Sequence, residues 1–347
     1  MSRNQMPYQH VQDIGEQGIL ERVQRFCPSA IVGDDAAILS TDPGKCLAIS
    51  TDMLVDGVHF SLGLASPGQV TTSPEDVGWR AAAANLSDLA AMGAVPLGAT
   101  MALGLSGNIP VAWVEEIYQG LTACLQRYDT ALVGGDICRS NLVTLSITVF
   151  GQVNPDKVIR RKAAQIGDAI VATGVHGSSR AGLELLLHPE LGQTLSDTER
   201  IHLIQNHQRP LPRLDVSLLL PALQLSHTEP IRVAGMDSSD GLADAVLQIC
   251  RASHVGALID SSQIPISPTV EKIVDPEQAM NWALYGGEDF ELILCLAPDL
   301  ANCLVEKLAG DARIIGTITS TPNVRLTHSN RALGDEILAM SQGFQHF

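Results

Sequence analysis

Six short acidic stretches carry the residue types in this chain that are best suited to chemistry. They are GDDAAIL with Asp34 and Asp35, STD with Asp52, NLSDLAAMGA with Asp88, LVGGD with Asp136, MDSSDGL with Asp237 and Asp240, and YGGEDFEL with Glu288 and Asp289. Taken singly, most are explained as well by structure as by function, because Gly-Asp pairs form turns and Ser-Ser-Asp-Gly caps helices. Asp88 is harder to explain in this way, since it lies in an Ala- and Leu-rich stretch where an unpaired carboxylate would be costly to bury.

Considered together, the acidic stretches predict a site for hard metal ions. Two carboxylates about 4 Å apart repel each other by roughly 4 kcal/mol at an effective dielectric constant near 20, so a cluster of them needs cations. Oxygen ligands without His or Cys suit Mg²⁺, which commonly joins carboxylates to substrate phosphates. Ser50 and Thr51, directly before Asp52, add hydroxyl oxygens. The chain has no GxxxxGK[ST] loop, no complete GxGxxG and no HRD or DFG motif, so a nucleotide here would be held through metals.

Alternating strands and helices must position these stretches, and their order indicates an α/β (α+β) chain of two domains. Cys46 to Ile49 is interpreted as a buried strand that ends where Ser50, Thr51 and Asp52 begin. The stretch from His188 to Pro212 is expected to be a long surface connection. A change of character after Gly151 places the predicted boundary near residue 155, giving domains 1–155 and 156–347. Helices are expected near 74–93, from 110 onwards, and over 181–187, 242–252 and 300–308, and strands near 131–133, 142–149, 169–173, 231–234, 257–260, 290–295 and 314–318.

Composition limits the class of protein. The chain has 347 residues, 45% of them apolar, and a net charge of −16, which argues against nucleic acid or an anionic membrane surface as a partner. Seven scattered cysteines with no CxxC pair predict neither a disulfide framework nor a zinc site. The first residues lack the apolar core of a signal peptide, and no run reaches the roughly 18 apolar residues of a membrane span. We expect a cytoplasmic protein.

The motifs, in the same order over nearly the whole chain, resemble the thiamine-monophosphate kinase family. That family shares its acidic stretches with aminoimidazole ribonucleotide synthetase, selenophosphate synthetase and the hydrogenase-maturation dehydratase. The STDMLVDGVHF stretch, the GGED segment and the GFQHF ending favour the thiamine enzymes. The resemblance implies transfer of the ATP γ-phosphoryl group to thiamine monophosphate. It also implies an aminoimidazole ribonucleotide synthetase-like fold, in which the mixed sheets of two N-terminal domains pair into a barrel in a homodimer.

The resemblance also implies residue roles, carried over by motif position. Several Mg²⁺ ions would be bound, and K⁺ is left open as a further ion. The metal ligands would be Asp35, Ser50, Thr51, Asp52, Asp88, Asp136, Asp237 and Asp240. The six aspartates of this set are also the catalytic candidates. ATP would contact Gly135, Asp136, Arg161, Ser239 and, with weaker support, Tyr118. Thiamine monophosphate would contact His59, Glu288 and Phe344. The family often has Tyr or Trp at the position of Phe344, so ring stacking is retained here without a hydroxyl or indole hydrogen bond.

Other functions are also compatible with this sequence. Another ATP-dependent synthetase or dehydratase of the superfamily would share the acidic stretches, although the hydrogenase-maturation member needs a C-terminal cysteine and this chain ends in Phe347. Selenophosphate synthetase needs a reactive residue in a Gly-rich loop, whereas Cys27 lies in RFCPSA. A non-catalytic nucleotide or metal sensor would be a different class of protein. Singly, Arg161 fits a solvated basic turn, Glu288 fits a turn cap, and His59 fits either a substrate contact or, less readily, a phosphoenzyme.

Overall fold

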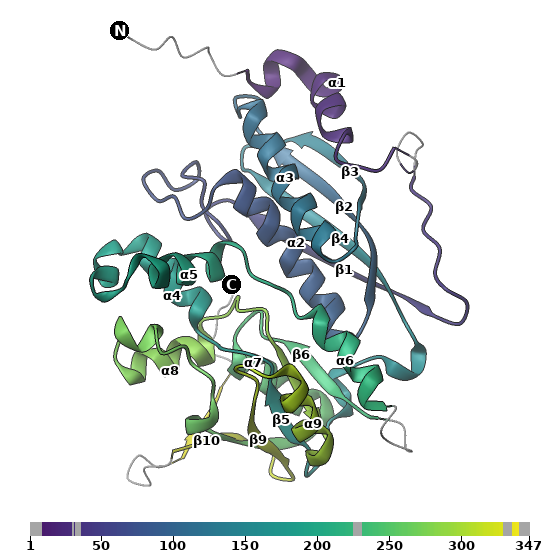
Figure 1. Cartoon of the computed structure of the whole chain (residues 1–347). Coiled ribbons are helices and arrows are strands. Elements are labelled where there is room, and N and C mark those ends of the chain that lie inside the picture. The colour runs from purple at the N-terminus through teal and green to yellow at the C-terminus, as the bar shows by residue number, and fades with distance from the viewer. Residues whose placement is uncertain (1–8, 30, 32–35, 225–230, 329–334, 340–347) are drawn as a thin grey trace. The chain divides into compact units, whose positions relative to one another are not determined.

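A computed structural model of the chain describes residues 9–29, 31, 36–224, 231–328 and 335–339 (Figure 1). The chain divides into two compact units. The first comprises Met1–Asp42, Ile49–Asn85 and Pro96–Gly151, and the second comprises Pro43–Ala48, Leu86–Val95 and Gln152–Phe347. The predicted domain boundary at residue 155 stays a prediction. Among the described residues, no helix combines the length and the apolar character needed to cross a bilayer.

The first unit is built on a four-stranded sheet with the order β1-β4-β2-β3. The elements that lie wholly or mostly in this unit are α1 (Val11–Gln24), β1 (Cys46–Val55), α2 (Pro74–Ala91), β2 (Val95–Leu105), α3 (Val111–Arg127), β3 (Leu132–Arg139) and β4 (Thr144–Val153). Helices α2 and α3 lie against one face of the sheet (Figure 1). They pack with their backbones in contact, because a Cβ added at Gly78 would lie 1.9 Å from the Ile117 carbonyl oxygen. At Gly120, an added Cβ would lie 1.8 Å from the Glu75 carbonyl oxygen.

Strand β1 is longer and more exposed than the short buried strand that the sequence predicted. It runs ten residues, from Cys46 to Val55, and forms an edge of the sheet. Leu47, Ile49 and Met53 have exposed fractions of 50%, 58% and 57%, so the apolar run is not buried within the chain. These residues alternate along the strand and therefore share one face. Apolar composition predicted a strand here, but it could not show that this face is exposed in the part of the chain that the structure describes.

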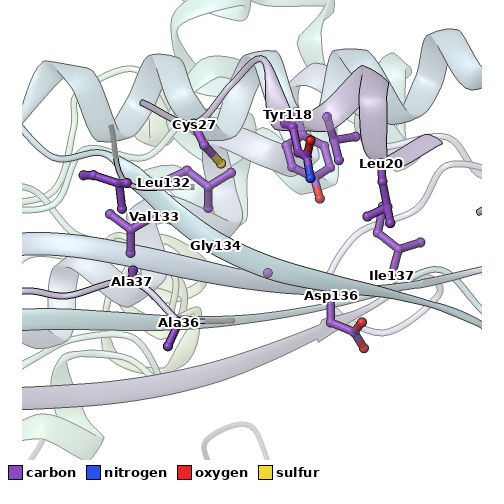
Figure 2. A pocket seen from close by; sticks show the side chains of 14 residues that line it. Leu20, Cys27, Ala36, Ala37, Tyr118, Leu132, Val133, Gly134, Asp136 and Ile137 are labelled. Carbon is purple, nitrogen blue, oxygen red and sulfur yellow. The ribbon is translucent and has the colours of Figure 1, made fainter. Parts of the chain in front are cut away.

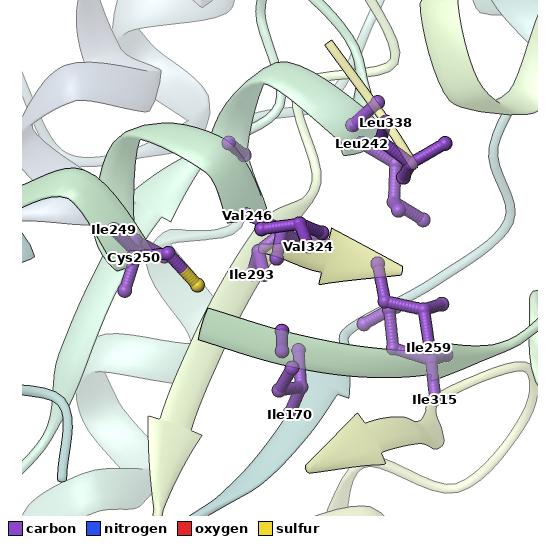
Figure 3. Packing of buried hydrophobic residues seen from close by; sticks show 14 of the residues in the cluster. Ile170, Leu242, Val246, Ile249, Cys250, Ile259, Ile293, Ile315, Val324 and Leu338 are labelled. Atoms are coloured by element: carbon purple, nitrogen blue, oxygen red, sulfur yellow. The ribbon is translucent and has the colours of Figure 1, made fainter. Parts of the chain in front are cut away.

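The second unit contains a mixed seven-stranded sheet with the order β11-β10-β7-β9-β5-β8-β6. Its strands are β5 (Ala169–Ala172), β6 (Ala234–Asp237), β7 (Gly256–Asp260), β8 (Leu292–Leu296), β9 (Arg313–Thr319), β10 (Val324–Thr327) and β11 (Glu336–Ile337). The main apolar core joins helix α7 (Leu242–Ser253) to this sheet, and Figure 3 shows Val246 and Ile249 of the helix facing Ile170 and Ile293 of the strands. Helix α9 (Pro298–Leu308) packs against β5, β8 and β9.

A smaller group of helices completes the second unit, and one of them lies where the sequence predicted a loop. It contains α4 (Ser178–Leu187), α5 (Asp197–Gln208) and α8 (Pro276–Tyr285), and α6 (Leu214–Gln224) follows α5 along the chain. The expected loop from His188 to Pro212 therefore contains a helix. Ser196 begins that helix with a capping box, in which its hydroxyl accepts from the Glu199 N–H and the Glu199 carboxylate accepts from the Ser196 N–H. Short 3-10 helices occupy Pro155–Lys157, Arg161–Ala163, Pro189–Thr194, Ser261–Gln263 and Val270–Lys272.

Candidate active site

Three of the predicted oxygen ligands lie inside strand β1, not after its end. Asp52 and Ser50 are on the face that α2 covers, whereas Thr51 is on the opposite face. The Thr51 Oγ1 atom lies 2.9 Å from the Thr148 Oγ1 atom of β4. The backbone N–H of Asp52 donates to the side-chain oxygen of Asn85 on α2, at 3.0 Å. The strand and helix together fix the position of the STD residues.

His59 follows β1 in a loop whose shape is set by a buried carboxylate. Asp56, 2% exposed, accepts hydrogen bonds from the backbone N–H groups of Leu62 at 2.9 Å and Ala65 at 2.8 Å. The Nδ1 atom of His59 accepts a hydrogen bond from the Val55 N–H at 3.1 Å. Because Nδ1 is the acceptor, the proton of a neutral imidazole would lie on Nε2.

A pocket in the first unit brings together three of the predicted ATP contacts, Tyr118, Gly135 and Asp136. Figure 2 shows Tyr118 and Asp136 among the residues that line it. Its volume is about 180 Å³. Burial raises the pKa of Tyr118, so its hydroxyl stays protonated. A Cβ added at Gly135 would lie 2.1 Å from the Met101 carbonyl oxygen, so only glycine fits here. Gly135 and Asp136 are inside β3, so the prediction that the strand ends near Val133 is wrong.

Sequence reasoning missed the residues that α1 and the following turn contribute to this pocket. Leu20, Val23 and Cys27 line it together with Tyr118. The Phe26 and Tyr118 rings lie 5.6 Å apart between centroids. These are ordinary apolar residues at helical spacing, and nothing in their types distinguishes a pocket wall from a core.

In the second unit, the end of β6 brings the MDSSDGL stretch beside the last turns of α2. The Asp237 carboxylate, 3% exposed, accepts hydrogen bonds from the hydroxyls of Ser87 at 2.8 Å and Ser239 at 3.3 Å. Asp88, next to Ser87, is half-buried, and Asp240 is exposed. The structure thus places three predicted metal ligands and one predicted ATP contact around one strand end and one helix.

Arg161 begins a 3-10 helix, Arg161–Ala163, that packs against α7 and β6. Its exposed guanidinium donates to the Gln248 side-chain oxygen at 3.1 Å, and its carbonyl accepts from the Ser253 hydroxyl at 2.8 Å. The backbone of Arg161 is therefore anchored while its charge faces solvent.

The GGEDFEL segment has an unusual backbone. Gly287, Glu288 and Phe290 have φ values of 67°, 61° and 52°. Left-handed backbone is costly for side chains such as Glu and Phe, so surrounding contacts must hold it. One of them is the hydrogen bond from the Glu288 N–H to the Ser239 carbonyl, at 2.7 Å. This bond joins the predicted substrate carboxylate to the MDSSDGL turn.

Asp289 supplies further contacts that hold this backbone. Its carboxylate accepts from the N–H groups of Gly177 at 2.7 Å and Ser179 at 2.8 Å, at the start of α4. Burial, with the charges of Glu291 and Glu288 adding to it, raises the pKa of Asp289 to about 7 against these two hydrogen bonds. Asp289 is therefore a structural cap for α4, a role that the sequence did not reveal.

His176 is a buried polar group beside the same segment. It is 0% exposed, with Nδ1 lying 3.0 Å from the Gly174 carbonyl oxygen and Nε2 lying 3.1 Å from the Ser238 hydroxyl. Burial lowers its pKa to about 4, so it is neutral at physiological pH. It supports the MDSSDGL turn without carrying charge.

The predicted site residues form two groups, one in each unit. The first group contains Ser50, Thr51, Asp52, His59, Tyr118, Gly135 and Asp136, and the second contains Asp88, Arg161, Asp237, Ser239, Asp240 and Glu288. Asp35 and Phe344 lie outside the described residues. Within the described ranges, no three His, Cys, Asp or Glu side chains gather closely enough to hold a metal ion.

Comparison with known proteins covers both units. Residues 33–153 match the family model of the AIR synthase related protein N-terminal domain, and residues 165–329 match that of its C-terminal domain. A thiamine-monophosphate kinase of Synechococcus elongatus is 52% identical over 336 residues, which is 96% of this chain and 97% of the relative. A thiamine-monophosphate kinase of Escherichia coli is 39% identical over 75% of this chain and 74% of the relative.

Solved structures show the same similarity. The thiamine-monophosphate kinase of Stenotrophomonas maltophilia is 33% identical, with a TM-score of 0.75 over 89% of this chain and 94% of that one. The complex of AaThiL with AMPPCP and TMP is 29% identical, with a TM-score of 0.68 over 93% and 96% of the two chains. The hydrogenase maturation protein HypE of E. coli, 19% identical with a TM-score of 0.73 over 93% and 96%, shares the fold alone.

Proposed function

This chain belongs to the thiamine-monophosphate kinase family, and we propose that it transfers the γ-phosphoryl group of ATP to thiamine monophosphate, giving thiamine diphosphate and ADP. The observation that carries the proposal is the 52% identity to a thiamine-monophosphate kinase over 96% of this chain. The related AaThiL structure, which holds AMPPCP and TMP together, supports the pairing of an ATP-type nucleotide with a second substrate.

The acceptor needs no general base. The second ionisation of a phosphate monoester lies near pH 6, so an anionic oxygen is already present at neutral pH. The remaining task is to align two polyanions and to stabilise the charge of the transferring group. The exposed guanidinium of Arg161 is suited to the triphosphate, and the His59 side chain, in the loop after β1, is the proposed contact for the acceptor phosphate.

The tautomer of His59 favours direct transfer over a phosphoenzyme. A phosphohistidine formed on Nε2 requires an unprotonated Nε2, and here the Val55 N–H assigns the proton of the neutral ring to that atom. His59 is therefore a donor that orients substrate, and the phosphoryl group passes in line from ATP to the acceptor.

The candidate metal ligands fit magnesium by their chemistry. They are Asp carboxylates and Ser and Thr hydroxyls, with neither His nor Cys among them, which are the hard oxygens that Mg²⁺ selects. Asp52, Asp136, Asp88, Asp237 and Asp240 would hold the ions. When bound, they would supply positive charge that neutralises both sets of phosphates. The Ser87 and Ser239 hydroxyls keep Asp237 oriented for this role.

The uncovered face of β1 supports a homodimer. Leu47, Ile49 and Met53 expose an apolar row on an edge strand, and large apolar surfaces of this kind mark protein interfaces. Sedimentation of the purified protein should give a dimer, and Ile49→Lys should give a monomer. Leu258→Lys, at a residue 40% exposed on β7, is the matched control and should remain dimeric. A wild-type monomer would contradict the dimer proposal.

The activity is tested by incubating the purified protein with ATP, Mg²⁺ and thiamine monophosphate. Thiamine diphosphate and ADP should appear in equal amounts. Product formed from free thiamine or from a purine precursor, with none from thiamine monophosphate, would overturn the assignment and favour another member of the superfamily.

A further inference from the structure

An arginine and a histidine at the ends of one short segment lie beside the two glutamates of the GGEDFEL segment. Arg213 Nη1 lies 2.6 Å from the Glu291 Oε2 atom and donates to the Thr173 carbonyl at 2.7 Å. Six residues earlier, the His207 Nδ1 atom lies 3.8 Å from the Glu288 Oε2 atom. The segment from His207 to Arg213, HQRPLPR, therefore holds the GGEDFEL segment at two points.

His207 is buried, whereas the carboxylate it faces is partly open to solvent. The exposed fractions of the two side chains are 3% for His207 and 34% for Glu288. Glu288 thus lies where the buried His207 meets the solvent-exposed surface. The Nδ1 atom of His207 also lies 3.3 Å from the Ser179 hydroxyl, which limits rotation of the ring.

The helices around His207 leave it little freedom to move. A Cβ added at Gly182 of α4 would lie 2.1 Å from the Leu203 carbonyl oxygen of α5 and 3.0 Å from the His207 Cβ. The two helix backbones are therefore in contact directly beside His207. A ring held in this way can order a flexible glutamate side chain before substrate arrives, which lowers the entropy cost of binding.

We propose that His207 is a positioning residue that fixes the Glu288 carboxylate for the cationic ring of thiamine monophosphate. This inference rests on the proposed function, because it concerns the affinity of that substrate. In this role His207 acts through Glu288, and not on ATP or on the reacting phosphates. The helix α5 that carries it lies in the part of the chain that the sequence alone marked as a loop.

The test compares substitutions that separate the packing of the His207 ring from its polar contact with Glu288. His207→Leu fills the space without polar atoms and should raise the KM for thiamine monophosphate by about 10-fold, with the KM for ATP changed by less than about 2-fold. His207→Asn places a polar atom near the position of Nδ1 and should restore most of the affinity. His202→Leu, at an exposed histidine of the same helix, is the matched control and should leave both KM values unchanged.

A double-mutant cycle with Glu288→Gln shows whether His207 acts through Glu288. The KM increase of the double variant should be close to that of Glu288→Gln alone. Multiplicative effects of the two substitutions, or equal increases in the KM values for both substrates, would overturn the proposal. If His207→Leu fails to fold, His207→Asn and His207→Gln decide. Only His207→Asn should keep most of the affinity for thiamine monophosphate, and equal KM values of the two variants would overturn the role. Wild-type protein that forms no thiamine diphosphate would instead show failure of the proposed function.

Discussion

Replacing His59 by Asn should keep the hydrogen bond from the Val55 N–H and remove the proposed contact with the acceptor phosphate. The Asn side-chain oxygen can accept the Val55 N–H bond that Nδ1 accepts at 3.1 Å, so the start of the loop should keep its shape. The Nε2–H donor is lost. A hydrogen bond to a charged group contributes about 2 kcal/mol, so the KM for thiamine monophosphate should rise ~30-fold. The KM for ATP should change by less than about 2-fold, because the predicted nucleotide contacts do not include His59.

Steady-state rates measure both constants, with each substrate varied while the other is saturating. His202→Asn, on the exposed side of α5, serves as the control for a surface histidine. A loss of turnover in His59→Asn with an unchanged KM for thiamine monophosphate would refute the reasoning, because it would give His59 a chemical role. Equal increases in the two KM values would also refute it.

Other predictions concern the scaffold around the site. Asp56→Ala leaves the Leu62 and Ala65 N–H groups without their acceptor, so the KM for thiamine monophosphate should rise about 10-fold while that for ATP stays constant; unchanged kinetics would contradict this. Gly120→Ala forces α2 and α3 apart and should lower the free energy of unfolding by more than about 3 kcal/mol in urea titrations, whereas the control Gly134→Ala should have little effect. Burial lowers the pKa of His176 in the folded protein, so this histidine is protonated in the unfolded chain before it is protonated in the folded one as pH falls. The stability that depends on a neutral His176 is therefore complete above about pH 6.5 and is lost as pH falls toward about 4. About 2 kcal/mol should be lost between pH 6.5 and 5, and His176→Asn should lack this part of the pH dependence.

The sequence predicted the local elements where periodicity was strong. Helix α2 was expected from its acidic first turn and Ala-rich body, and it runs from Pro74 to Ala91. Helix α5 was missed because its composition is polar and its cap, Ser196 with Glu199, lies in a stretch that resembles a loop. The exposed row on β1 was missed because apolar alternation does not distinguish a face packed within the chain from one left uncovered.

In the candidate site, too, some residues were singled out from the sequence and others were recognised only in the folded structure. The oxygen ligands and the DGVHF histidine were chosen by residue type and motif position, and their roles stay predictions. Supporting residues such as Asp56, Asp289 and His207 were not predicted, since their roles depend on backbone groups or side chains far away in the sequence. Their contacts exist only in the folded chain, and no local spacing encodes them.

The central claim is direct transfer of the γ-phosphoryl group from ATP to thiamine monophosphate, with His59 as a donor and not as a nucleophile. Its most direct test uses ATP that is chirally labelled at the γ-phosphate and determines the configuration of the transferred phosphoryl group in thiamine diphosphate. Direct in-line transfer predicts inversion of configuration. Retention would indicate a phosphoenzyme intermediate and would contradict the account.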